Sequence, residues 1–217
     1  MCFSFKSDIH PDELKGTIGA VSAKKSFEIF YQENPEGFGS TIFPNTYAIS
    51  LIHTKHGPTL VPMRYRVRPN GSEDEIPSKY NLYNARQESI LLKKTWNSLI
   101  GKNHVAIPMN AFNEWVTTDS GKKIVQFRKK NAELFWVAGL FDIWENPENK
   151  AKLISFAIIT TEPTDYIKTV GHDRCPIILG ESEAIEWIKI KSDPNSAFDY
   201  LPKSMNKIEF SHEFTVV

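Results

Sequence analysis

The chain has 217 residues, of which 41% are hydrophobic and 24% are charged. This is the length of one large domain and the composition of an ordinary globular protein, which excludes intrinsic disorder, a collagen-like repeat and a disulfide scaffold. Lysine plus arginine and aspartate plus glutamate each total 26, so no net positive charge draws in a polyanion and only a local cluster of cations could do so.

The elements expected in the first half of the chain are a short helix within residues 10–20, a loop at 33–39, strands at 46–52 and 59–63, and an exposed loop at 69–79. Leu92, Trp96 and Leu99 then follow helical spacing, which predicts a helix over residues 88–100 that stops at Gly101. The later elements are strands at 104–109, 123–128, 134–140 and 153–160, a helix at 181–190 and a closing strand at 208–216. Asp119-Ser120-Gly121 predicts a hairpin turn.

Many antiparallel-looking strands with few helices and no alternation of strand and helix indicate an α+β or mostly-β fold. No boundary divides the chain, so we expect a single domain over residues 1–217. No apolar run approaches the roughly 20 residues of a membrane span, and the start of the chain lacks the apolar core of a secretory signal. We therefore expect a cytoplasmic protein with no membrane partner.

Metal and disulfide chemistry find little support. The two cysteines, Cys2 and Cys175, argue against a cysteine-rich zinc module and against a structural disulfide in a reducing compartment, and Cys175 is interpreted as a core residue. Only His53 and His56 are closely spaced among the six histidines, which is a poor ligand set. We predict no metal and no cofactor.

Arg64, Arg66 and Arg68 occupy alternate positions. In a strand all three side chains would point to one face, where they could bind nucleic acid. The alternative is an ordinary solvated strand face.

Cys2 directly follows Met1, and methionine aminopeptidases remove Met1 when the second side chain is small. Removal would leave a free α-amine and a thiol on one residue, with reference pKa values near 7.7–8.0 and 8.5. Such a 1,2-aminothiol reacts with an aldehyde, first as an imine and then by closure of a five-membered thiazolidine ring, which a high effective molarity favours. The alternative is that a cysteine stands at this position without any role.

A second motif is Gly171-His172-Asp173-Arg174-Cys175-Pro176, between a predicted strand and a predicted helix. Histidine exchanges protons near neutral pH, and an arginine can hold a phosphate through two hydrogen bonds. A structured turn is the alternative interpretation.

Two further motifs carry polar groups beside aromatic or helical segments. Glu114, flanked by Phe112 and Trp115, would have a raised pKa if it is buried and could then transfer protons; otherwise it is an ordinary exposed glutamate. Asn84 and Arg86 precede the predicted helix and offer an amide and a guanidinium, although Asn84 could simply cap that helix.

Taken together, the motifs resemble the SOS-response-associated peptidase (SRAP) family in identity, order and separation. The resemblance is carried by Met1-Cys2, Asn84-Ala85-Arg86 with Glu88, Glu114-Trp115, and His172-Asp173-Arg174 with Pro176, and it extends to about Trp187. It implies an α+β domain with a barrel-like, mostly antiparallel β core and a few helices. It also implies a groove for single-stranded DNA that leads to Cys2.

By that resemblance the protein is an abasic-site sensor. After self-removal of Met1, the aminothiol of Cys2 would couple to the aldehyde of the ring-opened sugar. This activity is lyase-like, and the peptidase name of the family refers to the self-removal of Met1. The catalytic residues it implies are Cys2, Asn84, Glu114 and His172. The DNA-binding residues it implies are Arg86, Arg174, Trp115 and Thr161. The family strand that lines the groove is replaced around residues 63–68 of this chain, where Arg64 and Arg66 could restore positive charge. The partner is single-stranded DNA with abasic sites, bound by a monomer that is nucleoid-associated when on DNA.

The sequence departs from the family pattern beside the nucleophile. Phe3 and Ser4 stand where the family usually has glycine and arginine, and Thr41 replaces an asparagine. Two other functions remain open. An N-terminal-nucleophile amidohydrolase would use Cys2 to attack an amide with its own amine as base. A catalytically inactive module would bind single-stranded DNA by stacking bases on Tyr65, Tyr83 and Trp115.

Overall fold

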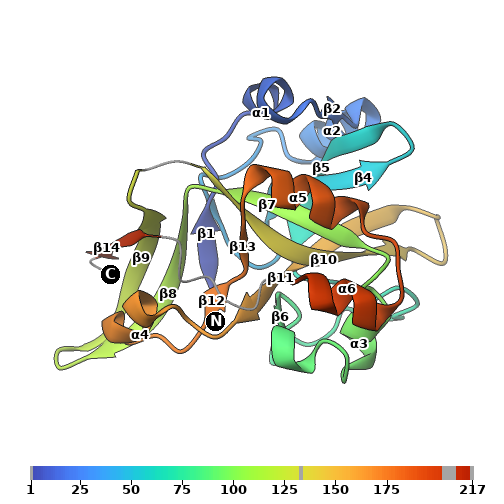
Figure 1. Cartoon of the computed structure of the whole chain (residues 1–217). Coiled ribbons are helices and arrows are strands. Elements are labelled where there is room, and N and C mark those ends of the chain that lie inside the picture. The colour runs from blue at the N-terminus through green and yellow to red at the C-terminus, as the bar shows by residue number, and fades with distance from the viewer. Residues whose placement is uncertain (1, 132–133, 202–208, 216–217) are drawn as a thin grey trace.

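Two β-sheets form the frame of the fold (Figure 1). The computed structural model describes residues 2–131, 134–201 and 209–215. The smaller sheet has the strand order β14-β9-β8-β1-β3, and all its neighbours are antiparallel. Its strands are β1 (Ser4–Lys6), β3 (Thr41–Ile42), β8 (Ala111–Thr118), β9 (Gly121–Lys129) and β14 (Phe210–Thr215).

The larger sheet closes into a barrel. Its strands run in the order β11-β10-β7-β4-β5, and β5 returns to pair in parallel with β11. These strands are β4 (Tyr47–Thr54), β5 (Gly57–Tyr65), β7 (His104–Met109), β10 (Phe135–Glu145) and β11 (Lys152–Thr161). Four short strands extend it: β2 (Val21–Ser22), β6 (Asn84–Arg86), β12 (Cys175–Pro176) and β13 (Ile178–Leu179).

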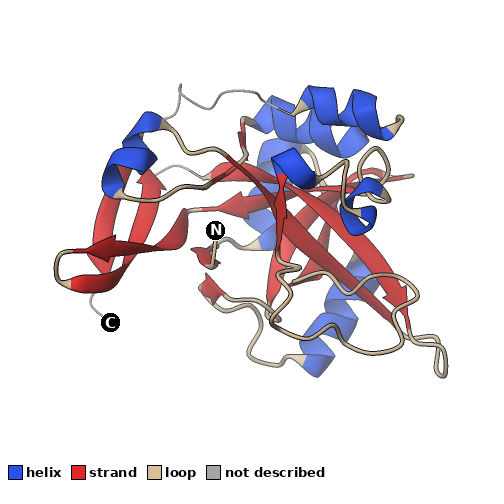
Figure 2. Cartoon of the chain, turned by 90° about the horizontal axis from the view of Figure 1, so that it is seen from below, coloured by secondary structure: helices blue, strands red, loops and turns tan. Residues whose placement is uncertain are grey.

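The helices lie around the outside of the sheets, and along the chain they do not alternate regularly with the strands (Figure 2). They are α1 (Pro11–Ile18), α2 (Lys24–Glu33), α3 (Lys94–Asn97), α4 (Asp165–Val170), α5 (Glu181–Lys189) and α6 (Pro194–Tyr200), with a 3₁₀ turn η1 (Gln87–Ser89). None of the helices in the described part of the chain is both long enough and apolar enough to cross a bilayer. The expected class, an α+β domain with a barrel-like and mostly antiparallel core, is confirmed.

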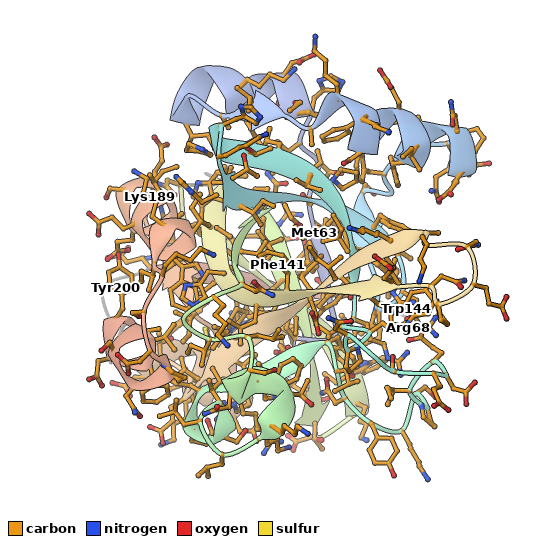
Figure 3. All side chains as sticks on the ribbon, turned by 90° about the vertical axis from the view of Figure 1, so that its right-hand side faces the viewer. Met63, Arg68, Phe141, Trp144, Lys189 and Tyr200 are labelled. Atoms are coloured by element: carbon orange, nitrogen blue, oxygen red, sulfur yellow. The ribbon has the colours of Figure 1, made fainter. Side chains whose placement is uncertain are left out.

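Helix α5 packs against β7 and β10 through Trp187, which is fully buried. The Trp187 indole donates to the carbonyl of Val105 and stacks on His104 with ring centroids 3.8 Å apart. Gly139 allows close packing in β10, because a Cβ there would lie only 2.6 Å from the Ala157 carbonyl oxygen. Met63 of β5 belongs to the same continuous core (Figure 3).

The N-terminal strand joins the two sheets. Strand β1 pairs with β3 and β8, and its Phe5 side chain packs on Tyr65 and Phe156 of the barrel, with ring centroids 5.3 and 6.5 Å apart. Burial of such an aromatic side chain contributes about 2–3 kcal/mol. This anchor holds Cys2, three residues before Phe5, at the junction of the sheets.

One predicted element is wrong. Residues 88–100 form η1 and the four-residue α3 with turns between them, not one helix, and Leu92 is 83% exposed. Trp96 and Leu99 still reach the core, because successive tight turns can present the same apolar residues inward without a continuous helix. Gly101 ends the segment as expected, with a left-handed φ of 81°.

The ends of the other predicted elements differ from their expected positions by no more than five residues, and the hairpin turn at 119–121 joins β8 to β9. Residues 208 and 216, predicted as ends of the closing strand, lie outside the described residues. Strand β8, helices α2, α4 and α6, and the short strands β1, β2, β3, β6, β12 and β13 were not expected from the pattern.

Candidate functional site

The backbone of Cys2 is held by two side chains. Its carbonyl oxygen accepts a hydrogen bond from Asn84 Nδ2 at 2.8 Å and another from the Tyr65 hydroxyl at 3.0 Å. Phe3, the next residue, donates from its backbone N–H to the Asn113 carbonyl of β8 at 3.3 Å. Cys2 itself is fully buried.

The barrel strands explain why these two donors lie together. Strands β5 and β6 both pair in parallel with β11, one after the other: Tyr65 lies opposite Phe156, and Asn84 lies opposite Ile158. The loop between β5 and β6 therefore returns the chain to the same edge of β11. It brings Tyr65, the last residue of β5, and Asn84, the first residue of β6, to the same carbonyl oxygen of Cys2.

Glu114 enters the site from the smaller sheet. It lies in β8, beside β1, and only 1% of it is exposed. Burial raises the pKa of this carboxyl from 4.5 to about 8, because the charged form loses its hydration. The side chain is thus predominantly protonated at neutral pH and can donate a proton, as a general acid must.

His172 faces Glu114 across the site. Its Nε2 lies 3.2 Å from Glu114 Oε2, and its Nδ1 lies 2.9 Å from the Arg174 carbonyl oxygen. Helix α4 ends at Val170 and is capped by Gly171, whose left-handed φ of 104° turns the chain so that the next residue points inward. Burial lowers the pKa of His172, so the ring is neutral at physiological pH.

Both thiols of the chain are buried near this pair. Burial raises the pKa of Cys2 well above its ordinary value, and the neighbouring Glu114 adds to the effect. Burial raises the pKa of Cys175 in the same direction. Neither cysteine is a preformed thiolate, so a reaction at Cys2 requires a proton acceptor or another nucleophilic atom of the same residue. The expectation that Cys175 is a core residue is confirmed.

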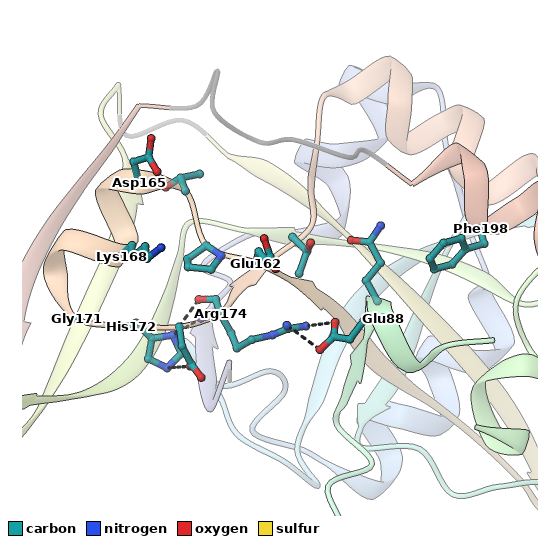
Figure 4. Close-up of a pocket in the computed structure, with 13 residues that line it drawn as sticks. Glu88, Glu162, Asp165, Lys168, Gly171, His172, Arg174 and Phe198 are labelled. Atoms are coloured by element: carbon teal, nitrogen blue, oxygen red, sulfur yellow. Dashed lines mark hydrogen bonds and ion pairs between the residues drawn. The ribbon is translucent and has the colours of Figure 1, made fainter. Parts of the chain in front are cut away.

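An open groove of about 1020 Å³ starts at His172 and runs past Arg174 and Glu88 to Phe198 (Figure 4). Arg174 makes a two-pronged ion pair with Glu88, at 2.9 and 2.8 Å, and donates to the Thr160 carbonyl at 2.7 Å. The groove is lined by four carboxylates and two cations: Glu88, Glu162, Asp165 and Asp173 against Lys168 and Arg174. Its net charge is therefore negative.

The remaining residues expected at the site lie around it. Thr161, at the end of β11, lines the groove. Arg86 ends β6 and is exposed. Trp115 is 40% exposed and packs against Phe3, 5.8 Å between ring centroids, while Phe3 in turn packs against Phe43 at 5.6 Å. Phe3 and Phe43, near Cys2, thus form a cluster with Trp115.

The arginines of residues 64–68 do not form the predicted strand face. Strand β5 ends at Tyr65, and Arg66 has a left-handed φ of 106°, so the alternation of a strand stops there. Arg64 and Arg66 instead pair with Glu75, with N–O distances of 3.0 and 3.1 Å.

Tyr65 is the site residue whose role sequence reasoning missed. It was considered only as a stacking surface, and that interpretation is wrong because its ring is fully buried. Nothing in its local sequence indicates a hydrogen bond to Cys2, since the contact spans 63 positions. Among the described residues, no group of three or more histidine, cysteine or acidic side chains could hold a metal ion.

Comparison with known proteins gives consistent results. The family model described as "SOS response associated peptidase (SRAP)" matches residues 1–214. The chain is 32% identical over 161 residues to the abasic site processing protein YoaM of Bacillus subtilis (strain 168), a match covering 74% of this chain and 68% of that protein. It is 29% identical over 210 residues to the abasic site processing protein HMCES of Gallus gallus, covering 86% of this chain and 62% of that protein.

Crystal structures of proteins from Bacteroides thetaiotaomicron and Bordetella bronchiseptica share the fold. The first has a TM-score of 0.79 at 18% identity, covering 98% of this chain and 91% of that chain. The second has a TM-score of 0.78 at 17% identity, covering 100% of both chains. With a family model that spans nearly its whole length and a 32% identical relative, this protein belongs to the SRAP family.

Proposed function

We propose that this protein processes abasic sites in single-stranded DNA by coupling covalently to them through Cys2. The observation that carries the proposal is the junction of three groups at one buried point: a Cys2 backbone fixed by Asn84, a buried Glu114 whose pKa is raised to about 8, and His172 3.2 Å from that carboxyl. The names of the relatives supply the substrate class.

The reaction needs a free α-amine on Cys2, and in the chain as translated that nitrogen is part of the Met1–Cys2 peptide bond. Hydrolysis of this bond consumes one water and releases methionine. We propose that Glu114 assists this self-processing by moving a proton between the attacking water and the departing amine. The family's peptidase name is consistent with such a step.

Coupling then proceeds in two stages. The α-amine attacks the aldehyde carbon of the ring-opened sugar, and loss of one water gives an imine. Glu114 supplies the proton that the departing hydroxyl requires, a contribution of typically 10²–10⁴-fold for a well-placed acid. The Cys2 sulfur then attacks the imine carbon, and the thiol proton passes to the nitrogen, which closes the thiazolidine ring.

His172 and Asn84 have supporting roles in this proposal. His172 receives the proton from, or returns it to, Glu114, and acts on the sugar oxygen when the deoxyribose ring opens. Asn84 fixes the Cys2 carbonyl, which limits the positions that the attached amine can take. Such positioning is what makes an intramolecular ring closure fast.

DNA binding is assigned to the exposed groups around the site. Arg86 contacts a backbone phosphate, Trp115 supports an unpaired base, and Thr161 adds a polar contact. Arg174 is enclosed by Glu88 and Thr160, so we assign it mainly to holding His172 through the turn that they share. The protein acts on the strand as a monomer.

The test is intact-protein mass spectrometry after incubation with an oligonucleotide that carries one abasic site. Protein whose mass shows loss of Met1 should gain the mass of the oligonucleotide less one water, and the adduct should survive heating in denaturant. Cys2→Ser should give no thiazolidine, whereas Cys175→Ser, the matched loss of the other thiol, should react like the unmodified protein.

Absence of an adduct from Met1-free protein would overturn the proposal. Hydrolysis of glutamine or a similar amide by that protein would then favour the amidohydrolase. Binding of the strand without any adduct would favour an inactive DNA-binding module.

A further inference from the structure

Three arginines converge on one carboxylate outside the Cys2 site. The Glu75 carboxylate lies 3.0 Å from Arg64, 3.1 Å from Arg66 and 3.8 Å from Arg68. Arg68 also lies over the Trp144 ring, 3.4 Å from its centroid (Figure 3). We call Arg64, Arg66 and Arg68 the arginine cluster. With Glu75 included, its formal charge is +2.

The single Glu75 carboxylate does not neutralise the three arginines, as a purely structural ion pair would. The three arginine side chains are only 12%, 5% and 16% exposed, so water screens their repulsion weakly. Within the described part of the chain, the buried Nε atoms of Arg64 and Arg68 have no hydrogen-bond partner. The left-handed φ of 106° at Arg66 adds backbone strain to the same cluster. Donors therefore remain for an anion that carries more charge and more acceptors than one carboxylate.

Glu75 lies on a loop segment that is held in place by its contacts with the arginine cluster. Residues 66–83 connect β5 to β6 without regular structure, and the first part is tied to the barrel where Trp144 donates to the Ser72 carbonyl at 2.7 Å. The next part, residues 73–76, is bound by the arginines: Arg68 donates to the Glu73 carbonyl, and Arg66 donates to the Ile76 carbonyl. Long irregular loops of this kind often have functional roles.

The cluster also adjoins the Cys2 site. Tyr65, between Arg64 and Arg66, donates to the Cys2 carbonyl, and its ring lies 5.7 Å from that of Tyr83. The side chains that line the groove on the His172 side carry a net negative charge, so the phosphates of a strand that reaches Cys2 are attracted more strongly to the arginine cluster than to that groove. Arginine binds carboxylate and phosphate with the same two-pronged geometry.

We infer that the arginine cluster is a binding site for a backbone phosphate of single-stranded DNA and that Glu75 occupies it until the strand arrives. The inference rests on the proposed function for its choice of ligand. Binding exchanges one carboxylate for one phosphate, so the Glu75 segment must leave the arginines. The acidic segment then acts as a competitive cover that favours a strand over small anions.

The experiment measures non-covalent binding, so that it is independent of the coupling reaction. The affinity of a Cys2→Ser protein for an undamaged oligothymidine is determined between 50 and 300 mM salt, alone and with Glu75→Gln added. Glu75→Gln should strengthen binding about threefold or more at the lowest salt and should steepen the salt dependence by about 0.7 per phosphate gained. Asp74→Asn removes the same charge from the same exposed segment and should change neither quantity.

Adding Arg68→Gln to the Glu75→Gln protein should cancel both gains. If Asp74→Asn strengthens binding as much as Glu75→Gln, or if Arg68→Gln leaves the gains intact, the site does not exist. Unfolding temperatures of all variants are compared, and a Glu75→Gln protein that stays folded without a gain in affinity also overturns the inference. If the protein does not couple through Cys2 but Glu75→Gln still increases the affinity and the salt dependence, the proposed reaction is wrong and the phosphate site is supported.

Discussion

Glu114 and His172 meet at 3.2 Å although they come from different parts of the fold, strand β8 and the turn after helix α4. Burial acts on the two groups in opposite senses: it raises the pKa of Glu114 to about 8 and lowers the pKa of His172. Both are therefore neutral at physiological pH. The proton lies on Glu114, where it can pass to a departing hydroxyl or to His172.

This arrangement predicts the pH dependence of coupling to an abasic site. The α-amine of Cys2 must be unprotonated to attack, so the rate rises through its ordinary pKa of about 7.7–8.0. Glu114 must be protonated to act as acid, so the rate falls as the pH passes about 8. We expect a narrow maximum near pH 8 in the rate of adduct formation, measured by gel or mass under single-turnover conditions.

Glu114→Gln should remove the fall at high pH and lower the maximal rate by about 10²-fold or more, because glutamine cannot supply a proton. Asp173→Asn is the matched control: its carboxylate lies 3.9 Å from His172 but is 88% exposed in its side chain. It should leave the shape of the profile nearly unchanged. A high-pH limb that persists in Glu114→Gln would assign that limb to another group.

The two donors to the Cys2 carbonyl predict a second effect. Asn84→Ala should slow coupling about tenfold or more, because the residue that carries the amine is less well positioned. Tyr65→Phe removes the other donor without a change in shape and should cost about 1 kcal/mol in the free energy of unfolding. Tyr83→Phe, which removes a neighbouring hydroxyl, is the control. Stability is measured by urea denaturation, and equal losses from Tyr65→Phe and Tyr83→Phe would count against the Tyr65 bond.

The sequence predicted most of the long strands because their apolar residues recur in short blocks bounded by turn residues, as in residues 104–109, which coincide with β7. It failed at residues 88–100, where a three- to four-residue spacing arises from consecutive tight turns as well as from a helix. Two missed helices did have cap signals. Thr164 caps α4 by accepting from Ile167, and Asp193 caps α6 ahead of Pro194.

Sequence motifs named the polar residues of the site but not their arrangement. Asn84, Glu114 and His172 were identified by resemblance to a family, and the fold brings them to one point through pairings that no local pattern contains. The arginines at 64 and 66 were expected on a strand face because alternation was the only local signal available. Their partner Glu75 lies in a loop whose path the sequence does not specify.

The two arginines that flank the site should differ in their effect on DNA binding. Arg86 is exposed, whereas Arg174 is buried in its pair with Glu88. Arg86→Gln should weaken binding of an undamaged single strand and lower the salt dependence by about 0.7, as expected for one lost phosphate contact. Arg174→Gln should alter that salt dependence little and should mainly reduce the coupling rate, since it disturbs the turn that holds His172. Equal changes in salt dependence would contradict this division.

His104 predicts how the stability of the fold responds to acid. Its Nε2 accepts a hydrogen bond from the Gly101 N–H at 2.8 Å, so the remaining ring proton lies on Nδ1, which donates to the Trp187 carbonyl at 2.9 Å. A second proton would have to sit on Nε2 against the Gly101 N–H. With burial as the main cause, the pKa of His104 is lowered from 6.5 to about 4.

Between pH 6.5 and pH 4 the unfolded chain therefore binds a proton at His104 that the folded chain does not, so the free energy of unfolding should fall by about 3 kcal/mol as the pH is lowered through this interval. His104→Gln cannot titrate and should reduce this fall, whereas His56→Gln, at an exposed turn, should not. Urea denaturation at pH 7 and pH 4.5 measures the difference. A fall of equal size in the His104→Gln protein would show that other groups cause it, because the rest of the chain is unchanged between the two proteins.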